Sequence, residues 1–576
     1  MEAKITQING NTVVATGLAD PKIGNMVHMG PNNLYGEVTS IIGENSTIQA
    51  YEDTVGLRIN DSVVDLNTQL SIELGPGLLS NIFDGLGRRL SAIDDNFIRK
   101  GMPLISLDRE KKWHFKPIKK VGDAVSEGDI IGEVEETSFI STKIMVPVGR
   151  AGKIASISEG EFTVNQEIAK IITSEDRQVV LTMLQVWPVR IARPFRKKLS
   201  TYEPLLTGQR IFDTLFPLHK GGSACIPGGF GTGKTVSEHQ FAKFSNTDIS
   251  IYIGCGERGN EMADVLNSFP SIKDPRTGKP IIEKMVLIAN TSNMPIIARE
   301  ASIFTGVTIA EYYRDMGYSV LLTADSTSRW AEALRQLGSE LGEMPVEEGF
   351  PASLFSNLAS FYSRAGVVSA MGSPDRSGSV TIIGAVSPPA GDFSEPVTQT
   401  TTRLIDTYWE LDNRLSNVRH YPPVNWTDSY SLAADSLSEY YIKNVGPSFF
   451  VYSKQILDLL NESDRINEIA SIIGREALPD RQAAVLRLSD MVKLYFLQQN
   501  AFDAEDTFTP IEVSYNIMSL LSKLITNVLG VIDSGTEYSE LKKDSIWDDA
   551  QMLRHKADHD KLSKEIDALP SKHGKK

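Results

Sequence analysis

Cysteine is nearly absent from this chain of 576 residues, which contains only Cys225 and Cys255. Two cysteines cannot build a disulfide framework or a cysteine zinc site, so we expect a reducing environment such as the cytoplasm. Long apolar runs are also missing, because no uninterrupted stretch approaches the roughly 18 residues that span a bilayer. The start, MEAKITQING, lacks a signal-peptide core. Any role at a membrane is therefore expected to come through partners.

Positive charge is scarce. Lys and Arg total 58 against 73 Asp and Glu, which gives a formal net charge of -15. Wrapping nucleic acid requires clustered Lys and Arg that neutralise phosphates, so this balance argues against nucleic acid as the main partner. A hydrophobic content of 41% is ordinary for a globular protein, and the length predicts about three or four domains.

Two parts of the chain are rich in short strands. Residues 1–72 contain closely spaced apolar segments such as NTVVATG and STIQAY, separated by Gly, Asn and Pro, which predicts an N-terminal β-barrel. Residues 113–185 form a second β-rich block, typical of an inserted domain or of a lipoyl-like carrier. A carrier displays its lysine on a hairpin tip, whereas Lys143 lies inside the apolar segment STKIMVP, so the inserted domain is favoured.

Strands alternate with helical stretches over residues 186–435, which predicts a parallel sheet covered by helices, with residues 73–112 packing on it. The candidate strands are SACIP, DISIYIG, KMVLIAN, SVLLTAD and SVTIIGAV. Ligands of such sheets bind where the strands end. Helical periodicity dominates residues 436–576 and predicts a C-terminal helical domain, whose tail LPSKHGKK is expected to be disordered.

The segment GGFGTGKT matches the phosphate-binding pattern G-x-x-x-x-G-K-[ST], follows an apolar strand and precedes a helix-compatible stretch. Its glycines let backbone N–H groups approach phosphates, and the helix adds the positive end of its dipole. Lys234 is predicted to reach the terminal phosphates and Thr235 to offer its hydroxyl to Mg²⁺. The predicted nucleotide-binding residues of this P-loop are Gly228, Gly229, Phe230, Gly231, Thr232, Gly233, Lys234, Thr235 and Val236.

Asp325 ends the strand SVLLTAD and is the candidate for holding the water shell of Mg²⁺. An Asp after a strand is also a common helix cap, a task that Ser326 and Thr327 could take equally well. With a P-loop in the same chain, the metal role is favoured.

Glu257 ends another predicted strand within GCGERGNE. A Gly-bracketed carboxylate at a strand end is well placed to polarise the water that attacks a γ-phosphate. From spacing alone, an ion pair with Arg258 and ordinary helical contacts of Glu261 are equally good explanations. The residues by themselves leave this choice open.

Longer motifs make the chain resemble the catalytic A subunits of A-type and V-type rotary ATPases. They are GGFGTGKT, GCGERGNEM, ANTSNMPIIAREASI, ADSTSRWAEALR, SPPAGDFSEPVTQ and QQNAFD, and the resemblance covers nearly the whole chain. It implies an N-terminal β-barrel, an inserted β-rich bulge domain, a RecA-like P-loop domain and a C-terminal helical bundle. It also implies that Glu257 polarises the attacking water, that Asp325 is the Walker B acid, and that Arg258 helps to hold phosphate or Glu257.

The resemblance further implies contacts to the base. Phe502 in QQNAFD resembles the aromatic residue that packs against adenine, and Phe350 in EEGFPA is the candidate for the other face. Two positions depart from the family. Gly229 stands where relatives commonly carry Pro, which is expected to loosen the loop. Thr232 stands where eukaryotic V-type enzymes carry a redox-sensitive Cys, so regulation by that thiol is not expected.

For a protein of this family, ATP and ADP are substrate and product and Mg²⁺ is the cofactor. The implied partners are three copies of a noncatalytic B subunit, which alternate with three catalytic chains in a hexamer, central and peripheral stalks, and a membrane sector that moves H⁺ or Na⁺ as the stalk rotates. The B subunit would supply a positively charged finger to the site. The implied location is peripheral, on the cytoplasmic face of the cell membrane.

Two alternatives belong to other classes. A noncatalytic regulatory nucleotide-binding subunit is disfavoured, because such a site should have lost at least one of Lys234, Thr235, Glu257 and Asp325. A Rho-like nucleic-acid translocase would need a basic, aromatic-lined barrel groove. Residues 1–72 contain only three basic residues, Lys4, Lys22 and Arg58, so nucleic acid is not an expected partner.

Overall fold

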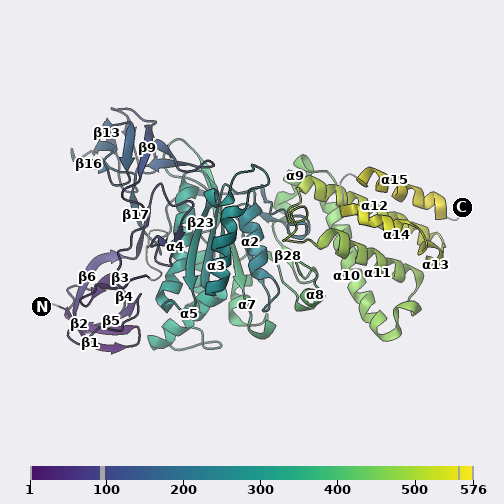
Figure 1. Cartoon of the computed structure of the whole chain (residues 1–576), viewed down its shortest axis with the longest axis horizontal. Coiled ribbons are helices and arrows are strands. Elements are labelled where there is room, and N and C mark those ends of the chain that lie inside the picture. Colours follow the sequence, from purple (N-terminus) through teal and green to yellow (C-terminus); the bar gives the residue numbers. More distant parts are fainter. Residues whose placement is uncertain (1–2, 91–97, 555–557, 574–576) are drawn as a thin grey trace. The chain divides into compact units, whose positions relative to one another are not determined.

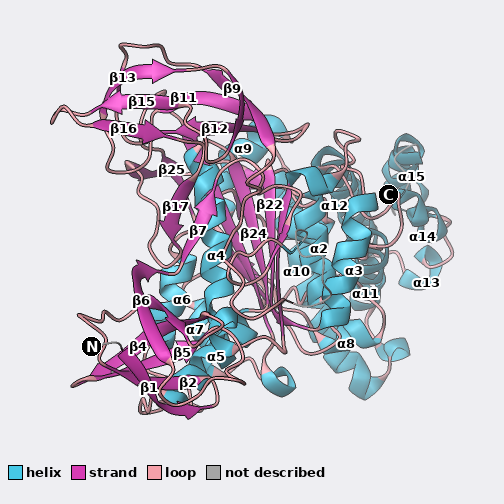
Figure 2. Cartoon of the chain, turned by 60° about the vertical axis from the view of Figure 1, so that its left-hand side comes forward, coloured by secondary structure: helices cyan, strands magenta, loops and turns pink. Residues whose placement is uncertain are grey.

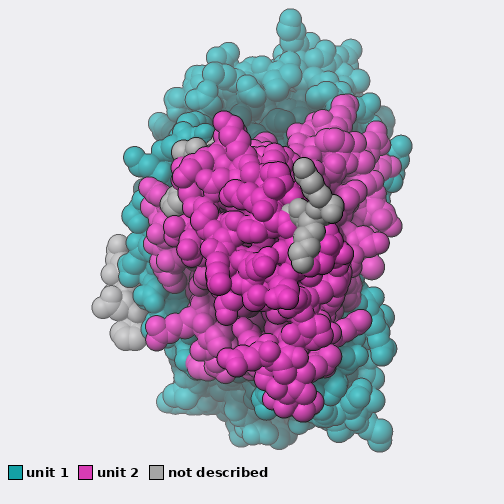
Figure 3. All heavy atoms as spheres, turned by 90° about the vertical axis from the view of Figure 1, so that its right-hand side faces the viewer, with its two compact units in different colours: residues 1–200, 220–223, 247–405 teal, residues 201–219, 224–246, 406–576 magenta. Residues whose placement is uncertain are grey.

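The structure is a computed structural model of the whole chain, and it describes residues 3–90, 98–554 and 558–573 (Figure 1). Helices and strands are distinguished by colour in Figure 2. The chain divides into two compact units (Figure 3). Unit 1 consists of residues 1–200, 220–223 and 247–405, and unit 2 of residues 201–219, 224–246 and 406–576.

The N-terminal part of unit 1 is a closed barrel with the strand order β1-β2-β5-β4-β3-β6. Its strands are β1 (Ala3–Asn9), β2 (Thr12–Thr16), β3 (Asn25–Met29), β4 (Leu34–Ile42), β5 (Asn45–Ala50) and β6 (Ser62–Gln69). Alternate residues point inward, so Ile5, Val13, Val27, Val38 and Ile48 are fully buried in one core. The predicted barrel is confirmed.

The inserted part of unit 1 contains two four-stranded sheets, β10-β13-β15-β16 and β12-β11-β9-β14. Their strands are β9 (Lys112–Pro117), β10 (Ala124–Val125), β11 (Ile130–Glu135), β12 (Ser141–Met145), β13 (Gly152–Ile157), β14 (Gly160–Thr163), β15 (Ala169–Ile172) and β16 (Gln178–Leu181). Lys143 lies within β12, and its ammonium donates a hydrogen bond to the Met316 carbonyl at 3.0 Å. This lysine is therefore a structural contact of an inserted domain and is not displayed on a hairpin tip.

Around the insert, β17 (Gln185–Pro188) pairs with β7 (Ser71–Leu74). The remainder of unit 1 carries a parallel sheet with the order β26-β24-β22-β23-β8. These strands are β8 (Ile82–Phe83), β22 (Ile249–Glu257), β23 (Met285–Thr291), β24 (Ser319–Asp325) and β26 (Ser377–Val386), while β25 (Gly366–Ser369) joins β26 to β18 (Lys197–Leu199) in antiparallel pairs. Nearly every residue of β22 to β24 is buried, as expected for a sheet covered on both faces.

Helices cover this sheet. They are α3 (Gly259–Ser268), α4 (Ile296–Asp315) and α5 (Thr327–Glu340), with α6 (Leu354–Tyr362) and α7 (Pro396–Thr402) further along the chain. Figure 2 shows α4 on one side of β22 and β24 and α3 on the other. The carboxyl ends of the strands therefore open toward the loops that carry the candidate catalytic carboxylates.

Unit 2 begins with short elements around the P-loop. Strand β21 (Ser223–Pro227) runs parallel to β27 (Thr407–Tyr408), which pairs antiparallel with β28 (Tyr430–Ser431), and β19 (Pro204–Leu205) pairs with β20 (Leu218–His219). The helices of this part are α1 (Arg210–Thr214), α2 (Lys234–Phe244) and α8 (Asn413–Asn417). As predicted, a buried strand leads through the glycine-rich segment into a helix that begins at Lys234.

The rest of unit 2 is helical, which confirms the predicted fold class. Its helices are α9 (Ala434–Asn444), α10 (Phe449–Ile473), α11 (Asp480–Val492), α12 (Ile511–Asp533), α13 (Tyr538–Leu541), α14 (Ile546–Asp549) and α15 (His559–His573). The expectation of a disordered tail is wrong for residues 569–573, because Leu562, Ile566 and Leu569 form a buried stripe along α15. Residues 574–576 lie outside the described residues.

One helix of the described chain, α12, is long and apolar enough to cross a membrane by length and composition alone. Its most apolar window is 56% buried inside the protein, and it packs against α10, α11 and α15. Leu521, Leu524 and Val528 fill the core of this bundle. These contacts are those of a core helix. A core helix requires the same apolar composition as a helix that crosses a membrane.

Candidate active site

The P-loop in unit 2 has the backbone that a phosphate cradle requires. Gly231 and Gly233 have φ angles of +81° and +82°, a region that glycine adopts without strain. Gly233 is the N-cap of α2 and, as a glycine, has no side chain with which to cap the helix. The helix N-terminus therefore presents backbone N–H groups and the positive end of its dipole without a capping side chain from the N-cap residue itself.

Side chains within the loop hold its first residues. The Thr232 hydroxyl donates to the Gly229 carbonyl at 2.8 Å, and the Lys234 ammonium donates to the carbonyls of Gly228 and Gly229 at 2.6 and 2.9 Å. A Cβ on Gly229 would lie 2.7 Å from the Asn413 Nδ2 atom. Gly229 is thus packed against Asn413. Gly229 is also the position where the absence of Pro is expected to loosen the loop, and the hydrogen bonds to its carbonyl restrain it.

A cavity of about 610 Å³ lies in unit 2 beside the first turns of α2. Its lining includes Gly231, Gly233 and Val236 of the P-loop region, the segment Tyr421–Pro423, and the segment Gln498–Phe502. The Phe502 side chain is 87% exposed, although Phe is among the residue types most often buried. Phe502 and Tyr421 give the cavity two flat apolar surfaces of the kind that stack on a nucleobase.

Glu257 is positioned at the end of a buried strand in unit 1. The eight residues of β22 before it are all buried, and Glu257 itself is half-buried. Its carbonyl accepts a hydrogen bond from the Ser292 N–H at 3.0 Å. A Cβ on the preceding Gly256 would lie 2.9 Å from Arg299 and 3.1 Å from Arg329, so two basic residues border this strand end.

Asp325 ends the neighbouring parallel strand. In the register of β22 and β24, Asp325 pairs with Gly254, and its side chain is buried. Helix α5 has Ser326 as its N-cap, so Asp325 precedes the capping position. The Thr327 hydroxyl donates to the Ala385 carbonyl at 2.9 Å. Asp325 therefore lies at the carboxyl edge of the sheet, one strand away from Glu257.

The proton affinity of Glu257 is high. Burial raises its pKa to about 8, and a hydrogen bond to Glu261 together with the negative charges of Asp325 and Glu261 adds to the shift. The Arg258 N–H, which lies 3.3 Å from Glu257 Oε1, acts in the opposite direction. A carboxylate with a pKa near the working pH of a cell has the property required of a general base.

Two other predicted residues, Arg258 and Phe350, are not placed against a bound nucleotide by the geometry of this site. Arg258 is exposed and forms the N-cap of α3. Phe350 is buried in unit 1 beneath the Arg335 guanidinium, which lies 5.2 Å from the ring centre. Phe350 does not line the cavity that contains Phe502. Its contact with adenine, and the phosphate contact of Arg258, stay predictions.

The donor groups fit Mg²⁺ that arrives with a nucleotide. Mg²⁺ in phosphoryl-transfer sites takes few protein oxygens and fills its other positions with water and phosphate. Thr235 of unit 2 carries a hydroxyl of this kind, and Asp325 of unit 1, considered by itself, carries a carboxylate. Within residues 3–90, 98–554 and 558–573, no group of three or more His, Cys, Asp or Glu residues is arranged to hold a metal by itself. Burial is the main cause of the raised pKa of Glu257, and a cation would relieve the smaller contribution that comes from the negative charges of Asp325 and Glu261.

Both cysteines are buried. Burial raises the pKa of Cys255 to about 12 and also raises that of Cys225, so neither thiol ionises at physiological pH. They are small buried residues.

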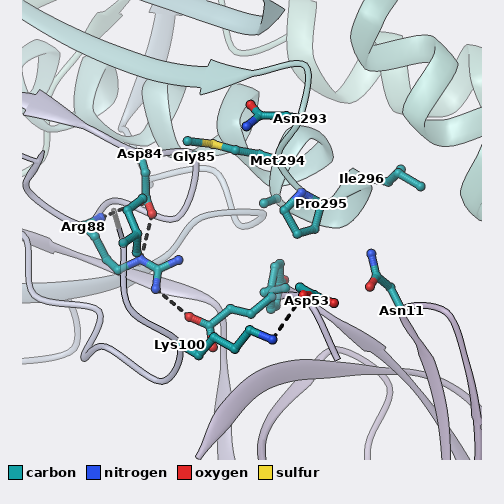
Figure 4. A pocket seen from close by; sticks show the side chains of 14 residues that line it. Asn11, Asp53, Asp84, Gly85, Arg88, Lys100, Asn293, Met294, Pro295 and Ile296 are labelled. Carbon is teal, nitrogen blue, oxygen red and sulfur yellow. Dashed lines mark hydrogen bonds and ion pairs between the residues drawn. The ribbon is translucent and has the colours of Figure 1, made fainter. Parts of the chain in front are cut away.

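A second cavity, of about 430 Å³, lies within unit 1 where barrel residues face the segment before α4 (Figure 4). Its two lining cations are already paired. Arg88 bonds Glu52 and Asp84, each at 2.7 Å, and Lys100 bonds Asp53 at 3.1 Å. Since both cations are neutralised by carboxylates, this cavity is a poor phosphate site, and we do not assign the nucleotide to it.

Sequence reasoning missed Tyr421 and Asn413. Tyr421 stands in RHYPPVNW, where an aromatic residue precedes two prolines in a loop, and this combination is the signal that was available. Asn413 had no such signal, because its contact with Gly229 joins residues that are 184 positions apart in the sequence.

Comparison with known families covers most of the chain. The nucleotide-binding domain of the ATP synthase alpha/beta family matches residues 208–431, its β-barrel domain residues 5–67, and its barrel-sandwich domain residues 104–190. The C-terminal domain of V and A type ATP synthase matches residues 438–540.

Curated relatives match over almost their full length. The V-type ATP synthase alpha chain of Thermoanaerobacter pseudethanolicus is 50% identical over 94% of this chain and 92% of its own. The corresponding chain of the A-type ATP synthase of Methanopyrus kandleri is 47% identical over 96% and 94%. Among solved structures, the assembled ATPase EscN of an enteropathogenic E. coli type III secretion system matches with a TM-score of 0.64 and 21% identity, covering 90% of this chain and 100% of that chain, which shows a shared fold.

Proposed function

Because the chain belongs to the family of alpha chains of the V-type and A-type ATP synthases, we propose that it is the catalytic component of a rotary enzyme that hydrolyses or makes ATP and moves H⁺ or Na⁺. The observation that supports catalysis most directly is Glu257. It is a half-buried carboxylate at the end of a buried strand, next to Asp325, with its pKa raised to about 8.

The P-loop, Lys234, Thr235, Asp325 and Glu257 each have a defined task in this proposal. The P-loop backbone and Lys234 bind the phosphates, and Thr235 and Asp325 are the residues that would hold Mg²⁺, Asp325 through water. When bound, the ion would neutralise phosphate charge. Glu257 accepts the proton of the water that attacks the γ-phosphate.

The base is assigned to the cavity beside α2. Phe502 supplies one face, and Tyr421 is the residue of the same cavity that we add to the predicted set. Adenine stacking in this cavity leaves the triphosphate to the neighbouring P-loop, whose Gly231 and Gly233 belong to the same lining. In the reverse direction the same groups bind ADP and phosphate, and the ion gradient sets which direction prevails.

The site is proposed to be completed by a second protein. Stabilising the charge of a transferring phosphoryl group is commonly the task of an arginine supplied by a neighbouring protein. We assign that cation to a noncatalytic B subunit, three copies of which alternate with three copies of this chain in a hexamer. Central and peripheral stalks would link the hexamer to a membrane sector, so this chain acts peripherally on the cytoplasmic face.

The test compares this chain alone with the chain reconstituted with its B-type partner. We expect the isolated chain to bind Mg-ATP and to turn it over slowly, with a large increase in ATPase rate when the B-type partner is added. An isolated chain with full activity would contradict the shared site. An isolated chain that binds no nucleotide would contradict the P-loop assignment itself.

A further inference from the structure

Arg210 is a buried arginine whose side chain is bonded to one loop of unit 2. It is the first residue of α1, and its side chain is 5% exposed. Its guanidinium donates to the carbonyls of Phe496 and Gln498 at 2.6 and 2.7 Å. It also bonds Asp506 Oδ1 at 3.0 Å and Thr509 Oγ1 at 2.9 Å. Burying a charge is costly unless its donors are well satisfied, and here four hydrogen bonds of the guanidinium hold residues 496–509.

Gln499 connects this loop to the opposite wall of the cavity. Its side chain is buried, and its Oε1 atom accepts from the Arg210 N–H at 2.9 Å. Its Nε2 atom donates to the carbonyls of Gly208 and Asp506 at 2.9 and 2.8 Å. Its backbone N–H donates to the Tyr421 carbonyl at 2.8 Å. Gln499 therefore connects Arg210 and Gly208 with the loop residue Asp506 and with the segment that carries Tyr421.

The loop also fixes its own tip. Asp506 Oδ2 accepts from the Asn500 N–H at 2.8 Å, and Asn500 Oδ1 accepts from the Phe502 N–H at 3.0 Å. Thr507 Oγ1 donates to Gln240 Oε1 of α2 at 2.9 Å. Phe502 stands at the end of this chain of bonds with an 87% exposed ring. A rigid loop that presents an exposed aromatic ring to a cavity is organised before its ligand binds.

We propose that Arg210 and Gln499 are positioning residues for the purine ring of the nucleotide. They hold the Phe502 loop and the Tyr421 segment as the two walls of one base-binding slot. This inference rests on the proposed function, because it names the residues that set base affinity in that same site. Arg210 and Gln499 act on the base through Phe502 and Tyr421, and the phosphates are bound by the P-loop.

This division of tasks is tested by comparing two ligands in the full chain. ATP needs both the base slot and the P-loop, whereas inorganic tripolyphosphate needs only the P-loop. We expect Gln499→Glu, which keeps the shape but removes the Nε2 donor, to weaken ATP binding by roughly 5- to 150-fold, the range given by loss of one base–aromatic stack. Tripolyphosphate affinity should stay within about twofold, and in the ATPase assay KM should rise more than kcat falls.

Arg210→Lys is the second variant, because it keeps the charge but loses the planar fork of donors. Ser489→Ala is the matched control. It removes a buried hydrogen bond of 2.7 Å to Ser463 in the same unit, and neither residue lines the cavity. We expect this control to leave the ratio of ATP to tripolyphosphate affinity unchanged.

The proposal is overturned if both variants bind ATP as the parent does. It is also overturned if ATP and tripolyphosphate affinities fall together, through unfolding or otherwise, because the network would then serve the fold in general. A parent chain that binds neither ligand would instead contradict the proposed function, and that result is visible before any variant is made.

Discussion

Glu257 and Asp325 lie at the carboxyl ends of adjacent parallel strands, and the charge of Asp325 contributes to the raised pKa of Glu257. The register places Asp325 opposite Gly254, three residues before Glu257. The acid that we propose for metal binding and the proton acceptor that we propose for catalysis are thus fixed by the same sheet. Because the backbone of the sheet sets their separation, neither depends on a mobile loop for its position.

Glu257→Gln should abolish most of the ATPase activity. The amide keeps the shape of the side chain but cannot accept the proton of the attacking water, so we expect kcat to fall by about 10²- to 10⁴-fold. Nucleotide affinity should change little. The matched control is Glu261→Gln on the first turn of α3, which we expect to retain activity. If the Glu257 variant hydrolysed ATP normally and the Glu261 variant did not, the roles of the two carboxylates would be exchanged.

The ATPase rate should depend on pH through Glu257. In the chain without nucleotide its pKa is raised to about 8, so the general base is mostly protonated below that pH, and kcat/KM, which reports the free enzyme, should rise as pH increases toward 8. Glu261→Gln removes one of the negative charges that cause the shift, so the acid limb of the profile should move to lower pH. A profile that is identical in parent and Glu261→Gln would contradict the coupling.

Thr235→Ala should weaken the binding of ATP with Mg²⁺ more than the binding of ATP without Mg²⁺. The hydroxyl of Thr235 is assigned to Mg²⁺, so its loss should weaken Mg-ATP binding and lower the hydrolysis rate by about 10- to 100-fold, which corresponds to about 1.4–2.8 kcal/mol of lost ligand interaction. ATP binding in excess chelator should be nearly unaffected. Thr235→Ser, which keeps a hydroxyl, is the control. If ATP affinity fell equally with and without Mg²⁺, Thr235 would contact only the phosphates and would not bind the metal.

Phe502→Ala should weaken ATP binding without affecting tripolyphosphate. Loss of one aromatic stack is worth about 1–3 kcal/mol, so the dissociation constant for ATP should rise by roughly 5- to 150-fold. Phe502→Tyr keeps the ring and should bind like the parent. Because the Phe502 side chain is 87% exposed, its removal should cost little stability. Unchanged ATP affinity in the Ala variant would remove Phe502 from the base site.

Arg190→Ala should destabilise unit 1 strongly. Arg190 bonds Glu37 of the barrel at 2.8 Å and Glu300 of α4 at 2.5 Å, and both carboxylates are buried. Its removal leaves two buried negative charges unpaired, at a cost of about 3–5 kcal/mol. Arg177→Ala breaks an exposed pair with Glu175 and should cost at most about 1 kcal/mol. The midpoints of urea unfolding provide the comparison.

Periodicity and apolar content were sufficient for most of the fold. The segment SVLLTAD coincides with β24, because a continuous apolar run that ends in a polar residue is typical of a buried parallel strand. The P-loop was equally readable, since its glycines and Lys234 have fixed spacing. The tail was misjudged, because the buried stripe that orders α15 also includes Leu562 and Ile566, which precede the segment LPSKHGKK.

The candidate site was predictable only where a local pattern carries the chemistry. Glu257 could not be chosen over an ordinary ion pair from spacing, since the property that distinguishes it, its raised pKa, comes from burial and from Asp325 on another strand. Arg210 gave no local signal at all. Its four side-chain partners lie between 286 and 299 positions further along the chain.

Helix α4 has 20 residues, so it is a rod about 30 Å long. Near its end, the Tyr313 hydroxyl donates to Glu136 of the insert, and the next turn receives the Lys143 ammonium. Its start follows the segment in which Ser292 bonds the Glu257 carbonyl. A single stiff helix therefore connects the insert with the segment that bonds the strand end of Glu257, so a displacement of the insert along the helix axis would act on that segment.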